Sequence, residues 1–281
     1  MKIHFKNQQK SDRLLDLTPP KIMGILNFTP DSFSDSGKFF TLDKALFQVE
    51  KMLSNGADII DIGGESTRPN APIVSLDDEL ERVIPLVEAV RQRFDCLISV
   101  DTSKAEVMKQ SALAGADIIN DIRALQEPQA LETAAELGLP VCLMHMQGTP
   151  QNMQQNPDYD DVVEEVADFL NQRIFACLNM GIPKEHIILD VGFGFGKTVQ
   201  HNYQLLKHLN VFVQSGYPVL AGLSRKSMIG AVLDKPVDQR VIGSVAGALL
   251  AVQNGAHIVR VHDVAETADA LKIWRAMKEV G

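Results

Sequence analysis

The stretch NGADIIDIGG, residues 55–64, joins a glycine to a short apolar run and indicates how this chain folds. Gly56 follows an amphipathic stretch, and a glycine there suits the left-handed position at which helices commonly end. The run that follows, IIDI, is almost wholly apolar, which is typical of a strand buried on both faces. The stretch therefore predicts the end of a helix followed by a strand of a parallel sheet.

The same arrangement recurs along the chain. Two further apolar runs, KIMGILN (21–27) and CLISVD (96–101), raise the number of candidate strands to eight, and helical patterns at 42–54, 76–94 and 104–114 lie between strands. Eight strands alternating with helices predict an α/β fold of the (β/α)8 TIM barrel type. A doubly wound open sheet is the main alternative, although it usually has fewer strands and divides into halves. The repeats are NGADIIDIGG (55–64), AGADIIND (114–121), LGLPVCLMH (137–145), MGIPKEHIILD (180–190), SGYPVLAGLS (215–224) and NGAHIVRVHD (254–263).

The chain is expected to form a single domain over residues 1–281. Its length suits one large α/β barrel, and neither a low-complexity tract nor an obvious linker interrupts the pattern of strands and helices. Residues 1–20 precede the first predicted strand and end in Pro19-Pro20. We therefore expect them to form a short N-terminal extension that covers one end of the barrel.

Composition limits the possible partners and the location. The formal net charge of −9 argues against a general surface for nucleic acid or an anionic membrane, so an anionic substrate would need a local basic pocket. The first residues lack the apolar core of a signal peptide, and no segment approaches the ~20 apolar residues of a membrane span. A cytoplasmic protein is expected. Cys96, Cys142 and Cys177 lack metal spacing and are interpreted as buried, reduced thiols.

The stretch LDVGFGFGKT, residues 189–198, resembles a phosphate-binding loop at first sight. The P-loop pattern requires Gly, four residues and then Gly-Lys-Ser/Thr, so that successive amides surround a phosphate. Gly196-Lys197-Thr198 supplies the end of the pattern, but the opening glycine would have to replace Val191. The dinucleotide pattern G-x-G-x-x-G fails as well, because Lys197 occupies its last glycine. These glycines, and Asp190 before them, therefore require another explanation.

Polar side chains close almost every predicted strand. In a (β/α)8 barrel the active site gathers at the carboxyl ends of the strands. Any one of these residues is explained equally well as a helix cap, because Asp, Asn and Ser favour that position. Together, on one face of one barrel, they are better explained by a site. They are Asn27, Asp61, Asp101, Asn120 with Asp121, His145, Asp190, Ser224 with Lys226, and Arg260 with His262.

One half of this set suits a flat organic ligand. Asp101, Asn120 and Asp190 offer carboxylate and amide oxygens, and a carboxylate accepts two parallel hydrogen bonds from adjacent N–H donors. An aminopyrimidine edge presents such donors. A metal site held by the protein is the alternative, but these positions lack the clustered or His-rich spacing of transition-metal sites.

The other half is cationic. Arg68, Arg260 and His262 suit a diphosphate, which Arg binds with its bidentate fork. Their alternative role is an ion-paired barrel end. A bound diphosphate recruits Mg²⁺, which takes substrate phosphates plus one or two protein oxygens, and Asn27 is a plausible single ligand.

Two loops are candidate lids over this face. Residues 28–40 are polar and rich in turn residues but carry Phe33, Phe39 and Phe40, which suit plain solvent exposure poorly. Residues 63–72 combine paired glycines with two prolines. Long loops of this kind at the mouth of a barrel commonly close over substrates. Ordinary surface loops are the alternative.

Eight motifs in order give the chain a resemblance to the bacterial dihydropteroate synthases. The resemblance extends from Ile22 to His262. Small departures occur in Asp35-Ser36-Gly37, where the family commonly has a second glycine, and at Gln147, where Arg is frequent; they concern loop motion. The motifs are MGILNFTPDSFSDSG (23–37), GADIIDIGGESTRP (56–69), SVDTSKAEV (99–107), ADIINDI (116–122), LMHMQGTP (143–150), LDVGFGFGK (189–197), LAGLSRKS (220–227) and VRVHDV (259–264).

The resemblance implies a transferase of folate biosynthesis that joins 6-hydroxymethyl-7,8-dihydropterin diphosphate to 4-aminobenzoate with Mg²⁺. It also implies a homodimer and a target for sulfonamides. Arg68, Asp101, Lys226, Arg260 and His262 are the implied catalytic residues, and Asn27 the implied metal ligand. By subsite, the implied residues are Thr67, Asp101, Asn120, Met144, Asp190 and Lys226 for the pterin, Arg68, Arg260 and His262 for the diphosphate, and Phe33, Thr67, Pro69, Phe195 and Ser224 for 4-aminobenzoate.

Two other functions fit the same barrel. A pterin-binding methyltransferase domain of the methyltetrahydrofolate–corrinoid kind would reuse the aspartates and the asparagine, but it has no need of a diphosphate site. A non-catalytic pterin-binding protein is the second alternative, because a fold alone does not prove activity. Retention of Arg68, Arg260 and His262 beside the pterin residues favours the synthase over both.

Overall fold

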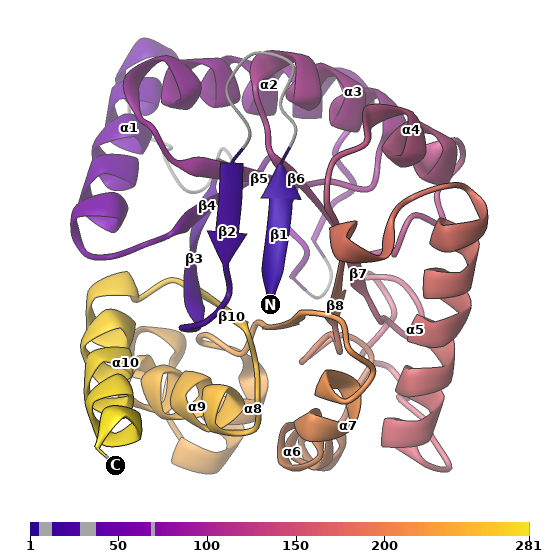
Figure 1. Cartoon of the computed structure of the whole chain (residues 1–281), viewed down its shortest axis with the longest axis vertical. Helices are drawn as coiled ribbons and strands as arrows, with labels where there is room; N and C mark the ends of the chain where they lie inside the picture. The colour runs from indigo at the N-terminus through magenta and orange to yellow at the C-terminus, as the bar shows by residue number, and fades with distance from the viewer. Residues whose placement is uncertain (6–12, 29–37, 69–70, 281) are drawn as a thin grey trace.

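A closed barrel of eight parallel strands forms the centre of the molecule (Figure 1). The computed structural model describes residues 1–5, 13–28, 38–68 and 71–280. Neighbouring strands follow one another in the chain, and the last strand pairs with the first through Ile258 and Lys21. The predicted (β/α)8 barrel is confirmed. Its strands are β3 (Lys21–Asn27), β4 (Ile59–Gly63), β5 (Leu97–Asp101), β6 (Ile118–Asp121), β7 (Val141–Met144), β8 (Ile187–Asp190), β9 (Val219–Ala221) and β10 (Ile258–Val261).

Helices surround the barrel and cover the outer faces of its strands (Figure 1). In β4, Ile60 and Ile62 pack outward into a buried cluster with Val83, Leu86 and other residues of α2. Alternate side chains point to opposite faces of a strand, which is why these strands are apolar throughout. The helices are α1 (Lys38–Ser54), α2 (Leu76–Arg93), α3 (Ala105–Ala114), α4 (Ala130–Leu137), α5 (Val162–Asn179), α6 (Val199–Lys207), α7 (Leu209–Val213), α8 (Ser227–Leu233), α9 (Val241–Gln253) and α10 (Val264–Glu279), with 3-10 turns at η2 (Lys184–His186) and η3 (Val237–Gln239).

The glycine that opens each repeat has the predicted left-handed backbone. Gly115 ends α3 with φ 110°, and Gly138 ends α4 with φ 64°. The glycines of the other four repeats also have positive φ. A side chain with a Cβ adopts this conformation only at a cost, so glycine sets the length of each helix.

The N-terminal extension closes the amino end of the barrel. Strands β1 (Lys2–Phe5) and β2 (Arg13–Asp16) pair antiparallel, with Ile3 opposite Leu15. Ile3, Leu15 and Leu17 are buried in one cluster with residues from the first half of all eight barrel strands. Figure 1 shows this hairpin lying across the barrel. The expectation that residues 1–20 cover one end is confirmed for the part that the structure describes.

The small-residue helix α9 packs on the barrel and also presents apolar side chains outward. Gly247, Ala248 and Ala251 are buried, whereas Ile242 and Leu250 are exposed. One face of α9 is therefore packed on the barrel, and the other face exposes apolar side chains. Within the described part of the chain, no helix has the length and apolarity needed to cross a membrane.

Candidate functional site

The loop after β8 is not a nucleotide-binding loop. The Gly192 amide donates to Oδ1 of Asp190 at 2.8 Å, and the Gly194 amide donates to Oδ1 of Asn202 at 2.7 Å. The Phe195 amide donates to the Gly192 carbonyl at 3.1 Å. A phosphate loop needs amides free for its ligand, and these three are bound within the protein. The sequence-based rejection of a nucleotide loop agrees with this geometry.

Close backbone contact explains the glycines of this loop. A Cβ on Gly192 would lie 1.9 Å from the carbonyl oxygen of His145, and one on Gly196 would lie 2.4 Å from that of Gln147. Both also have positive φ. The loop after β8 therefore rests directly on the loop after β7, and only glycine fits between them. Thr198 then caps the N-terminus of α6, the helix that follows this loop.

Arg260 lies between two buried carboxylates. Its Nε donates to Oδ2 of Asp61 at 2.6 Å, and its Nη2 donates to Oδ2 of Asp101 at 2.8 Å. Burial opposes the charge of Arg260, but the two carboxylates outweigh it and raise its pKa. Burial raises the pKa of Asp101 to about 7, and Arg260 opposes that rise. Arg260 thus joins the two halves of the predicted site in an ion-paired centre.

Asp61 is a member of this centre to which sequence analysis gave no role. Its side chain is completely buried within β4. Besides Arg260, it faces Asn120, whose Nδ2 lies 3.4 Å from both carboxylate oxygens. The available signal was a single carboxylate inside the apolar run IIDI, which requires a buried partner.

Lys226, Phe195 and Met144 form a second wall of the site, beside the ion-paired centre. The Nζ of Lys226 donates to the Phe193 carbonyl and lies 4.6 Å from the ring centroid of Phe195. Phe195 is buried in a cluster with Met144 and Met153. Burial lowers the pKa of Lys226 to about 8, and Asp190 opposes that shift. A buried cation beside an aromatic ring and two thioethers makes this wall suitable for a flat ligand.

The two walls approach each other at Gly222. A Cβ on this residue would lie 3.8 Å from Cβ of Arg260 and 3.9 Å from Nζ of Lys226. Burial raises the pKa of Asp190, and Lys226 and Arg260 both oppose that rise. This carboxylate therefore interacts electrostatically with both cations. Asp61, Asp101, Asn120, Asp190, Lys226 and Arg260 therefore belong to one charged cluster at the carboxyl end of the barrel.

Ser224 and His262 are hydrogen-bonded to each other. The His262 amide donates to Oγ of Ser224 at 3.1 Å, and Nδ1 of its ring lies 3.0 Å from the same oxygen. Burial lowers the pKa of His262 to about 4, and Arg260, Arg225 and Arg68 add to the effect. The ring is therefore neutral near pH 7. Its response to Arg68 places that exposed guanidinium within electrostatic range of the site.

Asn27 and Thr67 border the same centre. A Cβ on Gly63 would lie 3.6 Å from Cβ of Asp101 and 3.8 Å from Oδ1 of Asn27, so the two side chains flank β4. Thr67 and Asp101 line a cavity of about 490 Å³ between the loops after β4, β5 and β6. Phe33 and Pro69, predicted to contact 4-aminobenzoate, lie outside the described residues, as does Ser36.

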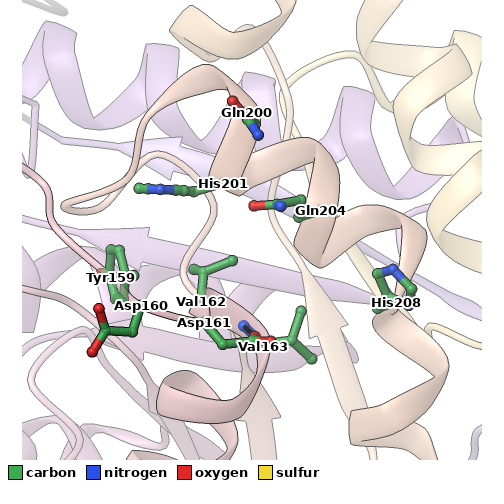
Figure 2. A pocket seen from close by; sticks show the side chains of 9 residues that line it. All are labelled: Tyr159, Asp160, Asp161, Val162, Val163, Gln200, His201, Gln204 and His208. Carbon is green, nitrogen blue, oxygen red and sulfur yellow. Dashed lines mark hydrogen bonds between the residues drawn. The ribbon is translucent and has the colours of Figure 1, made fainter.

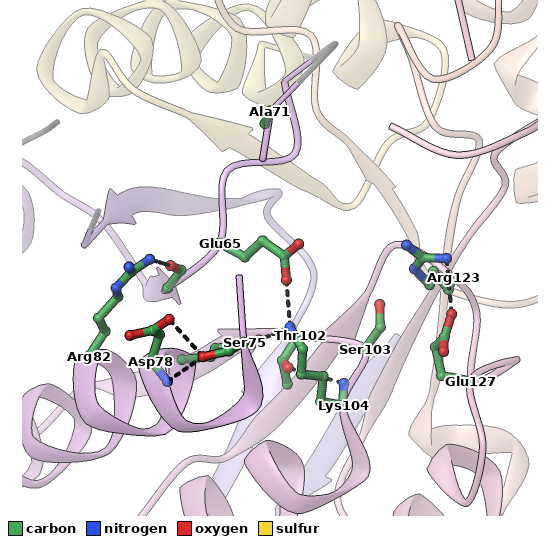
Figure 3. A network of polar contacts seen from close by, with 12 residues as sticks. Glu65, Ala71, Ser75, Asp78, Arg82, Thr102, Ser103, Lys104, Arg123 and Glu127 are labelled. Atoms are coloured by element: carbon green, nitrogen blue, oxygen red, sulfur yellow. Dashed lines mark hydrogen bonds and ion pairs between the residues drawn. The ribbon is translucent and has the colours of Figure 1, made fainter. Parts of the chain in front are cut away.

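An ion-pair network fixes the start of the loop that carries Thr67 and Arg68 (Figure 3). Lys104 donates to Glu65 at 2.6 Å and also to the buried Glu79. Burial opposes the charge of Lys104, but these carboxylates outweigh it and raise its pKa. Nη1 of Arg82 donates to the Gly64 carbonyl at 2.9 Å. The base of this candidate lid is thus held to α2 and α3.

Not every polar strand end belongs to the site. Asp121 accepts hydrogen bonds from Ser103 and from the amides of Arg123 and Leu125, so it caps the loop after β6. A second cavity, of about 420 Å³, lies between the start of α5 and α6 (Figure 2). Its lining, from Tyr159 to Val163 and from Gln200 to His208, includes none of the predicted site residues that the structure describes.

Comparisons with known proteins show the family to which the chain belongs. The model of the family described as "Pterin binding enzyme" matches residues 23–262. The chain is 70% identical to the dihydropteroate synthase of Haemophilus influenzae over 276 residues, 98% of each chain. The crystal structure of the Yersinia pestis dihydropteroate synthase with a sulfonamide drug complex superposes with a TM-score of 0.93 at 55% identity, covering 99% of this chain and 100% of that one.

A third structure adds a ligand. The Xanthomonas albilineans dihydropteroate synthase with 4-aminobenzoic acid has a TM-score of 0.93 and 48% identity, with both chains covered completely. The fold and the site define a pterin-binding barrel enzyme. Within that class, the chain belongs to the dihydropteroate synthase family, whose members are transferases. The family resemblance drawn from the motifs is confirmed.

Proposed function

We propose that this protein condenses 6-hydroxymethyl-7,8-dihydropterin diphosphate with 4-aminobenzoate to give 7,8-dihydropteroate and diphosphate. The observation that carries the proposal is the charged cluster, in which the carboxylates of Asp61, Asp101 and Asp190 meet the partly buried cations Lys226 and Arg260 at the carboxyl end of one barrel. Folds of this kind place their active sites at that end. Membership of the dihydropteroate synthase family supports this substrate pair.

The pterin would lie between the two walls of the cluster. Asp101, Asn120 and Asp190 offer acceptor and donor atoms to its aminopyrimidine edge, because an ionised carboxylate accepts two parallel hydrogen bonds. Met144 would contact the flat ring, while Thr67 and Lys226 would bind its polar edge. The burial of Asn120 and Asp190 supports this role, since polar groups shielded from water need hydrogen-bond partners, and Asp101 beside them is only partly exposed.

The diphosphate would bind beside Arg68, Arg260 and His262. An exposed guanidinium, a buried guanidinium and a neutral imidazole offer several N–H donors to its oxygens. Asn27 would hold Mg²⁺ together with the substrate's phosphates. In the described part of the chain no group of three His, Cys, Asp or Glu residues is placed to bind a metal, and a single amide oxygen suits an ion that is bound mainly by substrate. Mg²⁺ would neutralise charge on the phosphates.

The 4-aminobenzoate would stand against Phe195, with Phe33, Thr67, Pro69 and Ser224 around it. The related Xanthomonas albilineans enzyme has been solved with 4-aminobenzoic acid, which supports this second substrate. The Yersinia pestis relative was solved with a sulfonamide drug complex, and we propose that sulfonamides compete for the same subsite here.

The reaction needs no strong base. The bond between the pterin methylene and the diphosphate oxygen breaks, and its electron pair leaves with the diphosphate. Arg68, Arg260 and His262 stabilise the charge that grows there, while Asp101 and Asp190 stabilise positive charge on the pterin. The amine lone pair then forms the new C–N bond, and the proton that the amine loses passes to solvent water or to the released diphosphate. Exclusion of water by the loops prevents hydrolysis of the activated carbon.

We also propose that the protein is cytoplasmic, that each chain forms a single domain and that two chains form a homodimer. Ile242 and Leu250 on α9 and Ile273 and Met277 on α10 are exposed apolar side chains, which supports an interface on these two helices. Cys96, Cys142 and Cys177 are buried and none of them forms a disulfide, which suits a reducing compartment.

The proposed function is tested by measuring diphosphate release from 6-hydroxymethyl-7,8-dihydropterin diphosphate and Mg²⁺ with and without 4-aminobenzoate. We expect release that depends on the amine and yields dihydropteroate. Binding of the pterin without release would contradict the proposal and favour the non-catalytic or methyl-transfer alternatives.

A further inference from the structure

Lys197 is a buried lysine that the proposed reaction does not use; burial lowers its pKa, and Asp190 opposes that shift. Its side chain is 2% exposed. Its Nζ lies 2.9 Å from Nδ1 of His145, 3.0 Å from the carbonyl oxygens of both Gly192 and Phe195, and 3.3 Å from that of His145. Three of these partners are carbonyl oxygens, which accept, and Nδ1 of His145 accepts in the tautomer that carries its proton on Nε2. Lys197 therefore binds its own loop and the neighbouring one, and its donors are occupied within the protein.

The carbonyls of this loop are all held by side chains. Lys197 binds those of Gly192 and Phe195, and Lys226 binds that of Phe193. The other two are bound from the loop after β7: Nε2 of Gln154 donates to Gly194 at 2.5 Å, and the Tyr159 hydroxyl donates to Gly196 at 2.8 Å. The backbone of residues 192–196 is thus fixed in shape from several sides, which is unusual for a glycine-rich segment.

Phe195 depends most directly on this arrangement. Its amide donates to the Gly192 carbonyl, and its carbonyl accepts from Lys197, which also binds the Gly192 carbonyl. The ammonium therefore closes the turn from Gly192 to Phe195. The ring of Phe195 leaves this turn to pack against Met144, with Lys226 on its face.

We propose that Lys197 is a positioning residue for the 4-aminobenzoate subsite: by closing the turn from Gly192 to Phe195 it sets where the Phe195 ring stands. The proposal rests on the proposed function, since that assigns Phe195 to the amine substrate. It assigns Lys197 no contact with either substrate.

The test is Lys197→Met, which preserves most of the side-chain length but removes every donor. We expect the KM for 4-aminobenzoate to rise about tenfold, because the Phe195 carbonyl loses the ammonium, the Gly192 carbonyl keeps only the Phe195 amide, and the ring loses its fixed place. The KM for the pterin diphosphate should change less than the KM for 4-aminobenzoate, because Lys197 donates hydrogen bonds only to His145, Gly192 and Phe195 and acts on Asp190 and Lys226 through its charge alone. Lys207→Met, at the exposed end of α6, is the matched control and should change neither.

Tyr159→Phe tests the same loop with a smaller change, at the residue that follows Phe195. It removes only the hydroxyl that binds the Gly196 carbonyl, and we expect a rise of about two- to threefold in the KM for 4-aminobenzoate alone. If Lys197→Met does not fold, the KM values of Tyr159→Phe test whether this loop positions Phe195. An equal rise in both KM values, or no rise in either variant, would overturn the proposal and leave Lys197 a purely structural residue.

Hydrogen exchange separates failure of this inference from failure of the proposed function. Amide exchange of residues 191–197 should be faster in Lys197→Met than in the unchanged protein or in Lys207→Met, whether or not the protein makes dihydropteroate. An inactive protein with faster exchange in this segment would contradict the proposed function only. Unchanged exchange would contradict the inference that Lys197 closes the turn from Gly192 to Phe195.

Discussion

The two ends of the barrel are built from the same eight strands and differ in what those strands carry. At the amino end, Met23, Ile59, Leu97 and their counterparts form an apolar cluster that the hairpin of β1 and β2 covers. At the carboxyl end, Asp61, Asp101 and Arg260 replace such side chains with buried charges. Burial of apolar area stabilises a fold, whereas burial of charge generally costs stability. The difference teaches that stability and chemistry can be altered separately in this molecule.

A truncation at the closed end should have the largest effect on stability. Ile3 is completely buried under the barrel, and Ile3→Ala leaves a cavity there. We expect a loss of about 2–5 kcal/mol in the free energy of unfolding, measured by denaturant titration, with both KM values unchanged. Leu14→Ala, at a half-exposed position of the same hairpin, is the control and should cost far less. A changed KM in Ile3→Ala would break the separation between the ends.

Removal of the central cation at the open end should act first on turnover. Arg260→Ala takes away a donor proposed to stabilise the leaving diphosphate, and we expect kcat to fall by about 10²- to 10³-fold, more than the affinity for the pterin falls. Steady-state kinetics and calorimetry measure the two effects.

The same substitution sharpens the comparison, because Asp61 and Asp101 lose their partner and the protein should also become less stable. Arg260→Lys retains the charge but not the fork, so it should recover stability more than turnover. Unaffected turnover in Arg260→Ala would remove this residue from the proposed diphosphate site.

A smaller effect is expected from Asp190→Asn. The amide presents N–H atoms toward the donors of the pterin, while the bond from the Gly192 amide can be kept by its oxygen. We expect pterin affinity to fall by a factor on the order of 10–100, read by calorimetry. Asp269→Asn, exposed on α10, is the control. Affinity equal to that of the unchanged protein would place Asp190 outside the pterin site.

The sequence predicts the fold well because its signals are local. Each repeat places a glycine directly before an apolar run, and Gly115 and Gly138 adopt the left-handed backbone that this order predicts. The barrel itself brings the ends of the strands together, so Asp101, Asn120 and Asp190 could be grouped without knowing any contact.

The sequence does not predict which side chains pair with one another in the site. Arg260 pairs with Asp61 across 199 positions of the chain, and no local pattern states which carboxylate a guanidinium selects. Lys197 looked like the end of an incomplete phosphate loop, yet its ammonium turns back onto the carbonyls of its own loop. Asp121 has the same sequence context as Asn120 but turns away to cap a loop. Side-chain direction at strand ends depends on tertiary packing, which spacing alone does not contain.

The smallest predicted effect is a change in the pKa of His262. In the free protein, burial and the nearby guanidinium groups lower the pKa of this imidazole to about 4, against about 6.5 in an unfolded chain. Because the folded pKa is the lower one, His262 stabilises the fold above pH 6.5, and this contribution is lost as the pH falls toward 4. Inorganic diphosphate would bring negative charge beside the ring and should raise its pKa. An NMR titration, with the signal assigned by its absence in His262→Gln, measures both values. An ordinary pKa in the free protein would contradict the buried site described here. If diphosphate leaves the pKa of His262 unchanged, the phosphate does not lie beside this ring. The proposed diphosphate site would then consist of Arg68 and Arg260 alone.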